Sequence, residues 1–209
     1  MFRTCCLLAL ISLGCDRAGP ADYFPLSPGA QRVMKVYTHL VQGRDTSETT
    51  RVQLVEMVHG ERDVPGLGRV WVVEAPRDSG RSTFSYFRKR EDGVIQMMLN
   101  REREPVELLY LALPLSKGLK WYETREQREV MEVVGRDTVT IGDRHYPDCF
   151  EVRVSSTRAD WTLRQWLAPG IGPVKWVNRS SWTGKDGVRR ELLRQAELVS
   201  YQAPNSTDP

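Results

Sequence analysis

Histidine and cysteine are the side chains most able to act as a base, nucleophile or metal ligand near neutral pH. The 209-residue chain has three histidines and four cysteines. His39, His59 and His145 lie far apart, and no two of them occur with each other or with cysteine at a metal-ligand spacing such as H-x3-H or C-x2-C. Metal sites are commonly built on such spacings. We therefore predict no metal site and no cofactor.

His145 and Cys149 stand at an even spacing, which would place them on one face of an uninterrupted strand. An imidazole beside a thiol is the beginning of a nucleophile pair. Pro147 is expected to interrupt that strand, and no third orienting residue is evident. We therefore favour Cys149 as a buried packing residue over a catalytic one.

Motifs for covalent or phosphate chemistry are missing from the sequence, which has no G-x-S-x-G elbow, P-loop or G-x-G-x-x-G. Acidic residues mostly alternate with basic ones, as in residues 101–104. A glycosidase-type carboxylate pair depends on distances that a sequence does not show, so it stays open. We predict that the protein is not an enzyme and has no catalytic residues.

Four tryptophans, Trp161, Trp166, Trp176 and Trp182, fall in two neighbouring candidate strands. Trp166 and Trp176 are expected to come close across the turn at 168–173. Core packing between strands is the favoured interpretation. The functional alternative is an aromatic wall for an apolar or carbohydrate ligand on the concave side of a sheet.

These side chains must be positioned by β-strands, because short runs rich in Val, Tyr, Trp, Phe and Thr alternate with polar residues between Gly, Pro and Asp breaks. No long amphipathic helical stripe is present, although 189–198 could also form a helix. We predict an all-β, mainly antiparallel domain over 23–201 and a disordered tail at 202–209. The candidate strands are 33–41, 51–59, 69–75, 82–90, 94–101, 106–113, 120–128, 129–140, 149–156, 161–167, 174–182 and 188–200.

Two segments share the pattern P-L-S-x-G, at 25–29 and 114–118, and each leads into a candidate strand. One interpretation is a duplicated β-meander whose two halves form one sheet. The other is that a turn set by proline and glycine is simply common. A second proline and glycine pair, Pro169-Gly170, predicts a tight turn between two strands.

The N-terminus carries the pattern of an export signal. Met1-Phe2-Arg3 is followed by an apolar run over 5–13 that is too short for a membrane span. Ser12-Leu13-Gly14-Cys15 resembles the lipobox of bacterial lipoproteins, with Ser12 in place of the usual aliphatic residue. We predict a signal peptide at 1–14, lipid attachment at Cys15 and a tether over 15–22. Plain secretion with cleavage after Gly14 is the alternative, in which case Cys15 and Cys149 could form a disulfide.

Composition limits the classes of partner. The 30 Lys and Arg residues nearly balance the 27 Asp and Glu residues, for a formal net charge of +3. Such a balance is not the footprint of a nucleic-acid binder. A hydrophobic content of 40% at this length predicts one globular domain with a core.

Three motifs together resemble a family of uncharacterised bacterial lipoproteins. They are Tyr23-Phe24-Pro25-Leu26 with Gly29, Leu113-Pro114-Leu115 with Gly118 and Trp121, and the hairpin from Trp166 to Lys175. The family pattern has tryptophan after the first glycine and an aliphatic residue at the position of Pro173, and this chain departs at both. The resemblance implies a strongly curved antiparallel sheet, similar to the half-barrels or open barrels of periplasmic lipoprotein carriers. It implies no activity.

Two functions are carried forward. The first is a lipid-anchored bacterial envelope protein, facing the periplasm or the cell exterior, that binds or scaffolds another envelope component, such as an envelope protein, without catalysis. The second is a periplasmic carrier that holds a lipid or other hydrophobic ligand in the concave face of the sheet. The carrier predicts an apolar cavity lined by inward aromatics and by Met97 or Met98. An envelope hydrolase is a distant third, and the oligomeric state and the membrane stay open.

Overall fold

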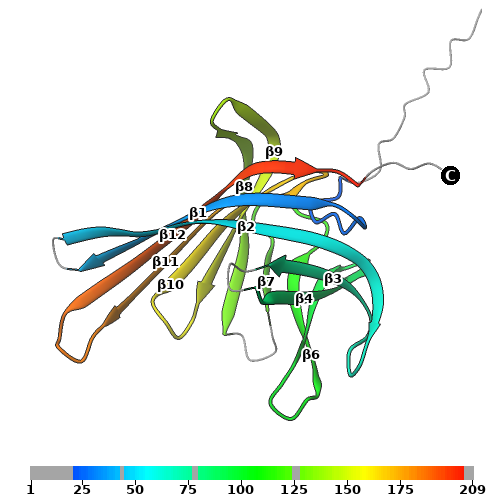
Figure 1. The fold of residues 1–209 in the computed structure, drawn as a ribbon, viewed down its shortest axis with the longest axis horizontal. Coiled ribbons are helices and arrows are strands. Elements are labelled where there is room, and N and C mark those ends of the chain that lie inside the picture. Colours follow the sequence, from blue (N-terminus) through cyan, green and yellow to red (C-terminus); the bar gives the residue numbers. More distant parts are fainter. Residues whose placement is uncertain (1–20, 43–44, 77–79, 124–127, 205–209) are drawn as a thin grey trace, which may run out of the picture.

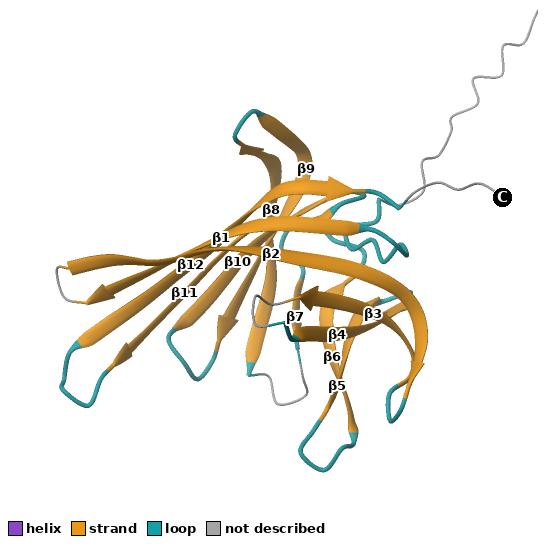
Figure 2. Cartoon of the chain, in the orientation of Figure 1, coloured by secondary structure: helices purple, strands orange, loops and turns teal. Residues whose placement is uncertain are grey.

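The computed structural model describes residues 21–204, apart from 43–44, 77–79 and 124–127. These residues contain no helix, so none is long and apolar enough to cross a membrane (Figure 2). They form one antiparallel sheet of twelve strands. The predicted all-β, strongly curved sheet is confirmed. Cys15, the signal peptide and most of the tether lie outside the described residues, as does most of the predicted tail.

Each of the twelve candidate strands overlaps one observed strand. Residues 189–198, for which a helix was the alternative, belong to a strand. The observed strands are β1 (Gln31–Gln42), β2 (Asp45–Val64), β3 (Gly68–Pro76), β4 (Ser82–Arg90), β5 (Gly93–Leu99), β6 (Pro105–Ala112), β7 (Lys120–Tyr122), β8 (Glu129–Ile141), β9 (Arg144–Ser156), β10 (Trp161–Ala168), β11 (Gly172–Thr183) and β12 (Arg189–Gln202).

The strand order is β6-β5-β4-β3-β2-β1-β12-β11-β10-β9-β8-β7, so that two six-stranded meanders meet where β1 pairs with β12. The sheet curls until β6 and β7 approach, which makes a nearly closed barrel with an unsealed seam. Across the seam the Leu109 amide donates to the Glu123 carbonyl at 3.0 Å. Figure 1 shows β1, β2, β10, β11 and β12 extending to one side while the strands around β3, β4 and β7 curl together at the other.

The observed limits of β2 and β9 differ from the expected ones because bulges absorb residues that normally end a strand. β2 runs through Gly60, where the pairing with β3 shifts register. The expectation that Pro147 interrupts its strand was wrong, since β9 continues through it. The partner strand β8 shifts register there, between Asp137 and Val139, and proline is tolerated at such bulges.

The two P-L-S-x-G turns are built alike. Gly29 and Gly118 have φ angles of 82° and 86°, which favour glycine. The Gly29 amide donates to the Val58 carbonyl in β2, and the Gly118 amide donates to the Val133 carbonyl in β8, both at 2.8 Å. Each acceptor is followed by a bulge in the pairing with the next strand. The two meanders therefore repeat one local structure, as a duplicated unit would.

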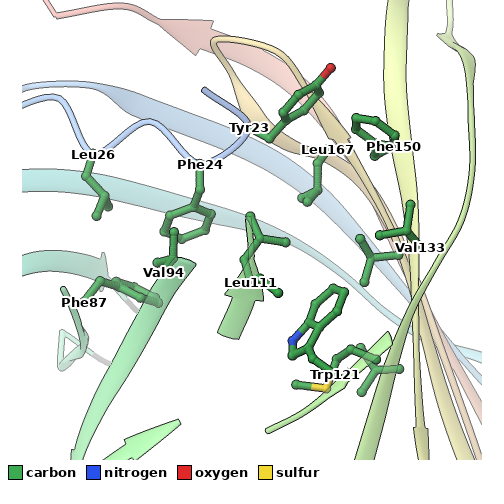
Figure 3. Packing of buried hydrophobic residues seen from close by; sticks show 14 of the residues in the cluster. Tyr23, Phe24, Leu26, Phe87, Val94, Leu111, Trp121, Val133, Phe150 and Leu167 are labelled. Carbon is green, nitrogen blue, oxygen red and sulfur yellow. The ribbon is translucent and has the colours of Figure 1, made fainter. Parts of the chain in front are cut away.

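The segment before β1 fills part of the barrel interior. Figure 3 shows Tyr23, Phe24 and Leu26 from this segment among buried side chains of the surrounding strands. The Phe24 ring lies 5.0 Å from the ring of Phe87 and 5.1 Å from that of Tyr110. Burial of such aromatic side chains contributes about 1.5–3 kcal/mol each. This part of the interior is a packed core.

The hairpins β2–β3 and β8–β9 fold back over the outer face of the sheet. Arg144 at the β8–β9 turn donates to the Val199 carbonyl in β12 at 2.6 Å, and Arg88 in β4 donates to the Leu67 carbonyl at the β2–β3 turn at 3.0 Å. Cys149 is buried under the β8–β9 hairpin. Outer residues of both meanders are therefore covered by their own hairpins.

Candidate binding cleft

A cleft of about 320 Å³ opens on the concave side of the sheet, within the size range of small-ligand sites. Its walls come from β1, β2 and β6 of the first meander and from β10, β11 and β12 of the second. Both polar and apolar side chains line it: Met34, Glu56, Tyr110, Leu163, Gln165, Pro173, Trp176, Asn178 and Arg194.

An ion pair stands at the inner end of the cleft. Arg32 Nε donates to Glu56 Oε2 at 3.1 Å, and Arg32 also donates to the Ile171 carbonyl at 3.3 Å. The guanidinium lies 5.7 Å from the centre of the Phe24 ring. The Arg32 side chain is 5% exposed, whereas that of Glu56 is 28% exposed and lines the cleft. Arg32 is thus held in the core, and it fixes a carboxylate that still faces the opening.

Two further polar side chains form the floor. The Tyr110 hydroxyl donates to Gln165 Oε1 at 3.4 Å, which joins β6 to β10 across the barrel. Burial, with a contribution from the Glu56 carboxylate, raises the pKa of Tyr110 to about 12. The phenol therefore stays neutral at physiological pH and keeps its hydrogen-bond donor. Gln165 is buried, although its side chain is polar.

Trp176 in β11 and Arg194 in β12 form the opposite wall. The Arg194 guanidinium lies 5.9 Å from the Trp176 ring centre, within the range of a cation–π contact. Arg194 is exposed, while Trp176 is partly buried. An adjoining hollow of about 420 Å³ shares both residues and is lined further by Val36, Val52, Gln53, Leu54 and Pro76. Trp176 thus lines both hollows, and each of them has polar and apolar side chains in its walls.

The expected meeting of Trp166 with Trp176 does not occur. Trp176 pairs in register with Gln165, so both side chains face the cleft, whereas Trp166 pairs with Lys175. Neighbouring residues of a strand point to opposite faces, which places Trp166 on the outer surface. There its ring lies 6.0 Å from the Lys175 ammonium. The strand register therefore places Trp166 and Trp176 on opposite faces of the sheet, although they lie close along the hairpin.

The remaining two tryptophans share the concave side with Trp176 by strand alternation. Trp161 packs against the main interior cluster. Trp182 lies near the end of β11 and is 43% exposed. Among the four predicted wall residues, Trp176 is the one that lines the cleft, so the others do not complete a continuous aromatic wall around it.

His145 and Cys149 do not form a nucleophile pair. The Cys149 thiol is fully buried and donates to the Tyr146 carbonyl at 3.2 Å, and burial raises the pKa of this thiol. The His145 ring is exposed and lies 3.0 Å from the Thr140 hydroxyl. A protonated, buried thiol is a poor nucleophile. The prediction that Cys149 is a buried packing residue is confirmed.

A histidine, a carboxylate and a serine meet elsewhere, between β2, β3 and β4. His59 Nε2 lies 2.6 Å from Glu74 Oε2, and the Ser82 hydroxyl donates to the other carboxylate oxygen. These hydrogen bonds lower the pKa of Glu74. In a nucleophile triad the imidazole must stand between serine and carboxylate to take the serine proton. Here the carboxylate is in the middle, so this arrangement does not activate Ser82.

The ion pair of the cleft has an apolar counterpart in the second meander. Arg32 pairs in register with Glu56, three residues beyond the first P-L-S-x-G turn. Trp121 pairs with Met131 at the same distance beyond the second turn. Both Trp121 and Met131 are buried in the main core. The same position of the repeated structure is therefore occupied once by opposite charges and once by two hydrophobic side chains.

Fold and cleft together define an open antiparallel barrel with a mixed polar and aromatic cleft. Comparison with protein-family models, curated proteins and solved structures gives no match. No three His, Cys, Asp or Glu residues of the described chain are grouped so that they could hold a metal ion. The resemblance to a lipoprotein family stays a prediction.

Proposed function

We propose that this protein is a lipid-anchored, non-enzymatic component of the bacterial cell envelope, and that it binds another envelope component in the concave cleft. The observation that carries the proposal is the Arg32–Glu56 ion pair. A buried ion pair is often neutral or unfavourable for stability compared with well-packed hydrophobic residues. The second meander uses Trp121 and Met131 at this position. A binding role would explain why charged residues occupy a position that is hydrophobic in the second meander.

The N-terminal pattern supports the location. With a lipid on Cys15, residues 15–22 would span at most about 28 Å before the barrel begins. The barrel would then be held near a membrane surface, where a concave cleft can meet large or membrane-bound ligands. One acyl group gives weak anchoring, whereas the diacylglycerol of a lipoprotein gives a stable one.

A carrier of long hydrophobic chains has less support. The side chains expected to line its cavity lie elsewhere, because Met97 is buried under the β2–β3 overhang and Met98 is 46% exposed. Aromatic residues such as Phe24 fill part of the interior. A hydrocarbon chain in the cleft would give no partner to the Asn178 amide and would remove water from the Glu56 carboxylate, which Arg32 contacts through one oxygen. These placements favour a ligand with polar groups.

The test is photo-crosslinking of the lipidated protein in its native envelope. A photoreactive amino acid replaces Leu163, which lines the cleft, and in a matched variant it replaces the exposed Thr162, which faces the opposite side of β10. We expect a discrete adduct from position 163 and not from position 162. Equal labelling from both positions, or none from position 163, would overturn the proposal.

The anchor is tested separately by mass spectrometry of the mature N-terminus. We expect the Cys15 sulfur to carry a diacylglycerol, and the variant Cys15→Ser to leave the membrane fraction. An unmodified Cys15, or a disulfide between Cys15 and Cys149, would contradict the anchored location without changing the cleft.

A further inference from the structure

We propose that the ligand of the cleft is a neutral saccharide, whose ring packs on Trp176 and whose hydroxyl groups bind Glu56, Gln165 and Asn178. This inference rests on the proposed function and adds the chemical class of the ligand. Its evidence is the set of hydrogen-bonding groups in the cleft and their place beside an aromatic ring.

The polar groups of the cleft match hydroxyl groups. Glu56 offers the carboxylate oxygen that Arg32 does not contact, and Gln165 offers its amide donors, since its oxygen accepts from Tyr110. Asn178 offers an amide with two donors and an acceptor, and Arg194 offers donors. A hydroxyl donates one hydrogen bond and accepts two, so it can pair with any of these side chains. A ligand with several hydroxyls satisfies them together. A purely apolar ligand would remove them from water without replacement, at a cost for every group left unpaired.

Trp176 supplies the apolar surface that such a ligand also needs. A saccharide ring has C–H groups on its faces and hydroxyls around its edge, and an indole offers a broad flat surface with a polar edge. Gln165 pairs with Trp176 in register, and Asn178 follows it on the same face of β11. One amide therefore lies beside Trp176 on β10, and the other follows it along β11. A ring stacked on Trp176 would have its edge hydroxyls directed toward them.

Charge favours a neutral ligand. An anionic group deep in the cleft would meet the Glu56 carboxylate, because Arg32 is already paired with that residue and buried. A cationic group at the outer wall would meet Arg194. The exposed Arg194 side chain stacks on Trp176 in this structure, and a stacked ligand would take its place and leave the guanidinium free to donate to hydroxyls.

The experiment analyses the adduct formed from position 163 in the native envelope. The adduct is purified, acid-hydrolysed and examined for monosaccharides, fatty acids and added amino acids, with the uncrosslinked protein treated in parallel. We expect monosaccharides in stoichiometric amount. We also expect Trp176→Phe to lower the adduct yield by about tenfold, the equivalent of one lost good contact, while Trp166→Phe on the outer face leaves the yield unchanged.

The outcomes distinguish the saccharide assignment from the binding function. An adduct that contains a second polypeptide, or fatty acids beyond those of the uncrosslinked protein, but no sugar overturns the saccharide assignment and leaves the binding function standing. Absence of any adduct from position 163 overturns both. A sugar adduct whose yield falls equally in Trp166→Phe and Trp176→Phe overturns the assignment of Trp176 as the stacking surface.

Discussion

The two meanders share a turn, a register and a bulge, yet they place different side chains at one inward position. In the first, Arg32 and Glu56 form an ion pair beside the cleft. In the second, Trp121 and Met131 pack in the core. The backbone geometry is set by the turn glycines and by the hydrogen bonds to Val58 and Val133. The fold therefore does not require charges at this position.

The two places where the meanders meet also differ. β1 and β12 pair along the whole of β1, from Gln31 to Gln42. β6 and β7 approach at the seam, where the Trp121 indole donates to the Leu109 carbonyl at 3.1 Å. Regions with fewer backbone hydrogen bonds open at lower free energy. We expect the barrel to open first at the β6–β7 seam.

The largest expected effect comes from breaking the ion pair on its exposed side. Glu56→Met leaves the buried Arg32 charge unpaired and should lower the free energy of unfolding by about 3–5 kcal/mol. Arg32→Met should cost less, because the remaining Glu56 side chain is 28% exposed and keeps part of its hydration. Urea denaturation at neutral pH measures both. A greater loss in Arg32→Met than in Glu56→Met would contradict this account of the ion pair.

The equivalence of the two turns predicts equal costs. Gly29→Ala and Gly118→Ala each force a side chain into the left-handed region and should lower the free energy of unfolding by about 1–2 kcal/mol. Neither added methyl group would meet a neighbour within 4 Å, so strain of the backbone dominates. Gly135→Ala is the matched control, because its surroundings are equally open and its φ lies outside that region. Costs at positions 29 and 118 that differ by more than about 1 kcal/mol would break the comparison.

The seam has its own test. Trp121→Phe removes the hydrogen bond from the indole to Leu109 and should cost about 1 kcal/mol. Hydrogen exchange should speed up at the Leu109 amide before it changes in β1 or β12. Trp182→Phe, at an exposed tryptophan, should leave both readouts unchanged. Uniform faster exchange throughout the sheet in Trp121→Phe would argue against a locally weak seam.

The smallest expected effect depends on pH, because Glu123 is only partly buried and solvent screens its charge. Burial, together with the hydrogen bond and charge of Glu129, raises the pKa of Glu123 to about 7. A carboxyl group with a raised pKa stabilises the fold when protonated, so its contribution is complete below the unfolded value of 4.5 and is lost as the pH rises through about 7. Thermal unfolding of the wild type should therefore shift downward between pH 5 and pH 8, and Glu123→Gln should reduce that shift. If the wild type and Glu123→Gln show the same dependence of thermal unfolding on pH, the Glu123 carboxyl does not cause the shift.

Much of the fold could be predicted from sequence because alternation and turn chemistry are local. The twelve strands follow from period-two patterns between glycine and proline breaks. The limits of β2 and β9 could not be predicted, since whether Gly60 or Pro147 ends a strand depends on a bulge formed with the partner strand. The early end of β7 at Tyr122 likewise had no clear local signal.

Most of the cleft could not be predicted from the sequence. One face of β1 carries Arg32 and Met34, and the other carries Val33 and Lys35. Each face thus has a polar and an apolar residue, so the sequence does not show which face is inside. Tyr110 and Gln165 meet across the barrel although they are 55 residues apart. The sequence identifies Trp176 as a residue of either the core or a ligand wall, and the choice between the two depends on its register with Gln165. Contacts between distant strands decide these points.

The most direct test of the central claim joins stability and binding in one variant. Arg32→Met with Glu56→Met gives this position two hydrophobic side chains, as in the second meander. We predict that its free energy of unfolding equals or exceeds that of the wild type, and that crosslinking from position 163 is lost. A double variant as unstable as Glu56→Met alone, or one that still crosslinks like the wild type, would contradict the claim that this ion pair serves binding rather than folding.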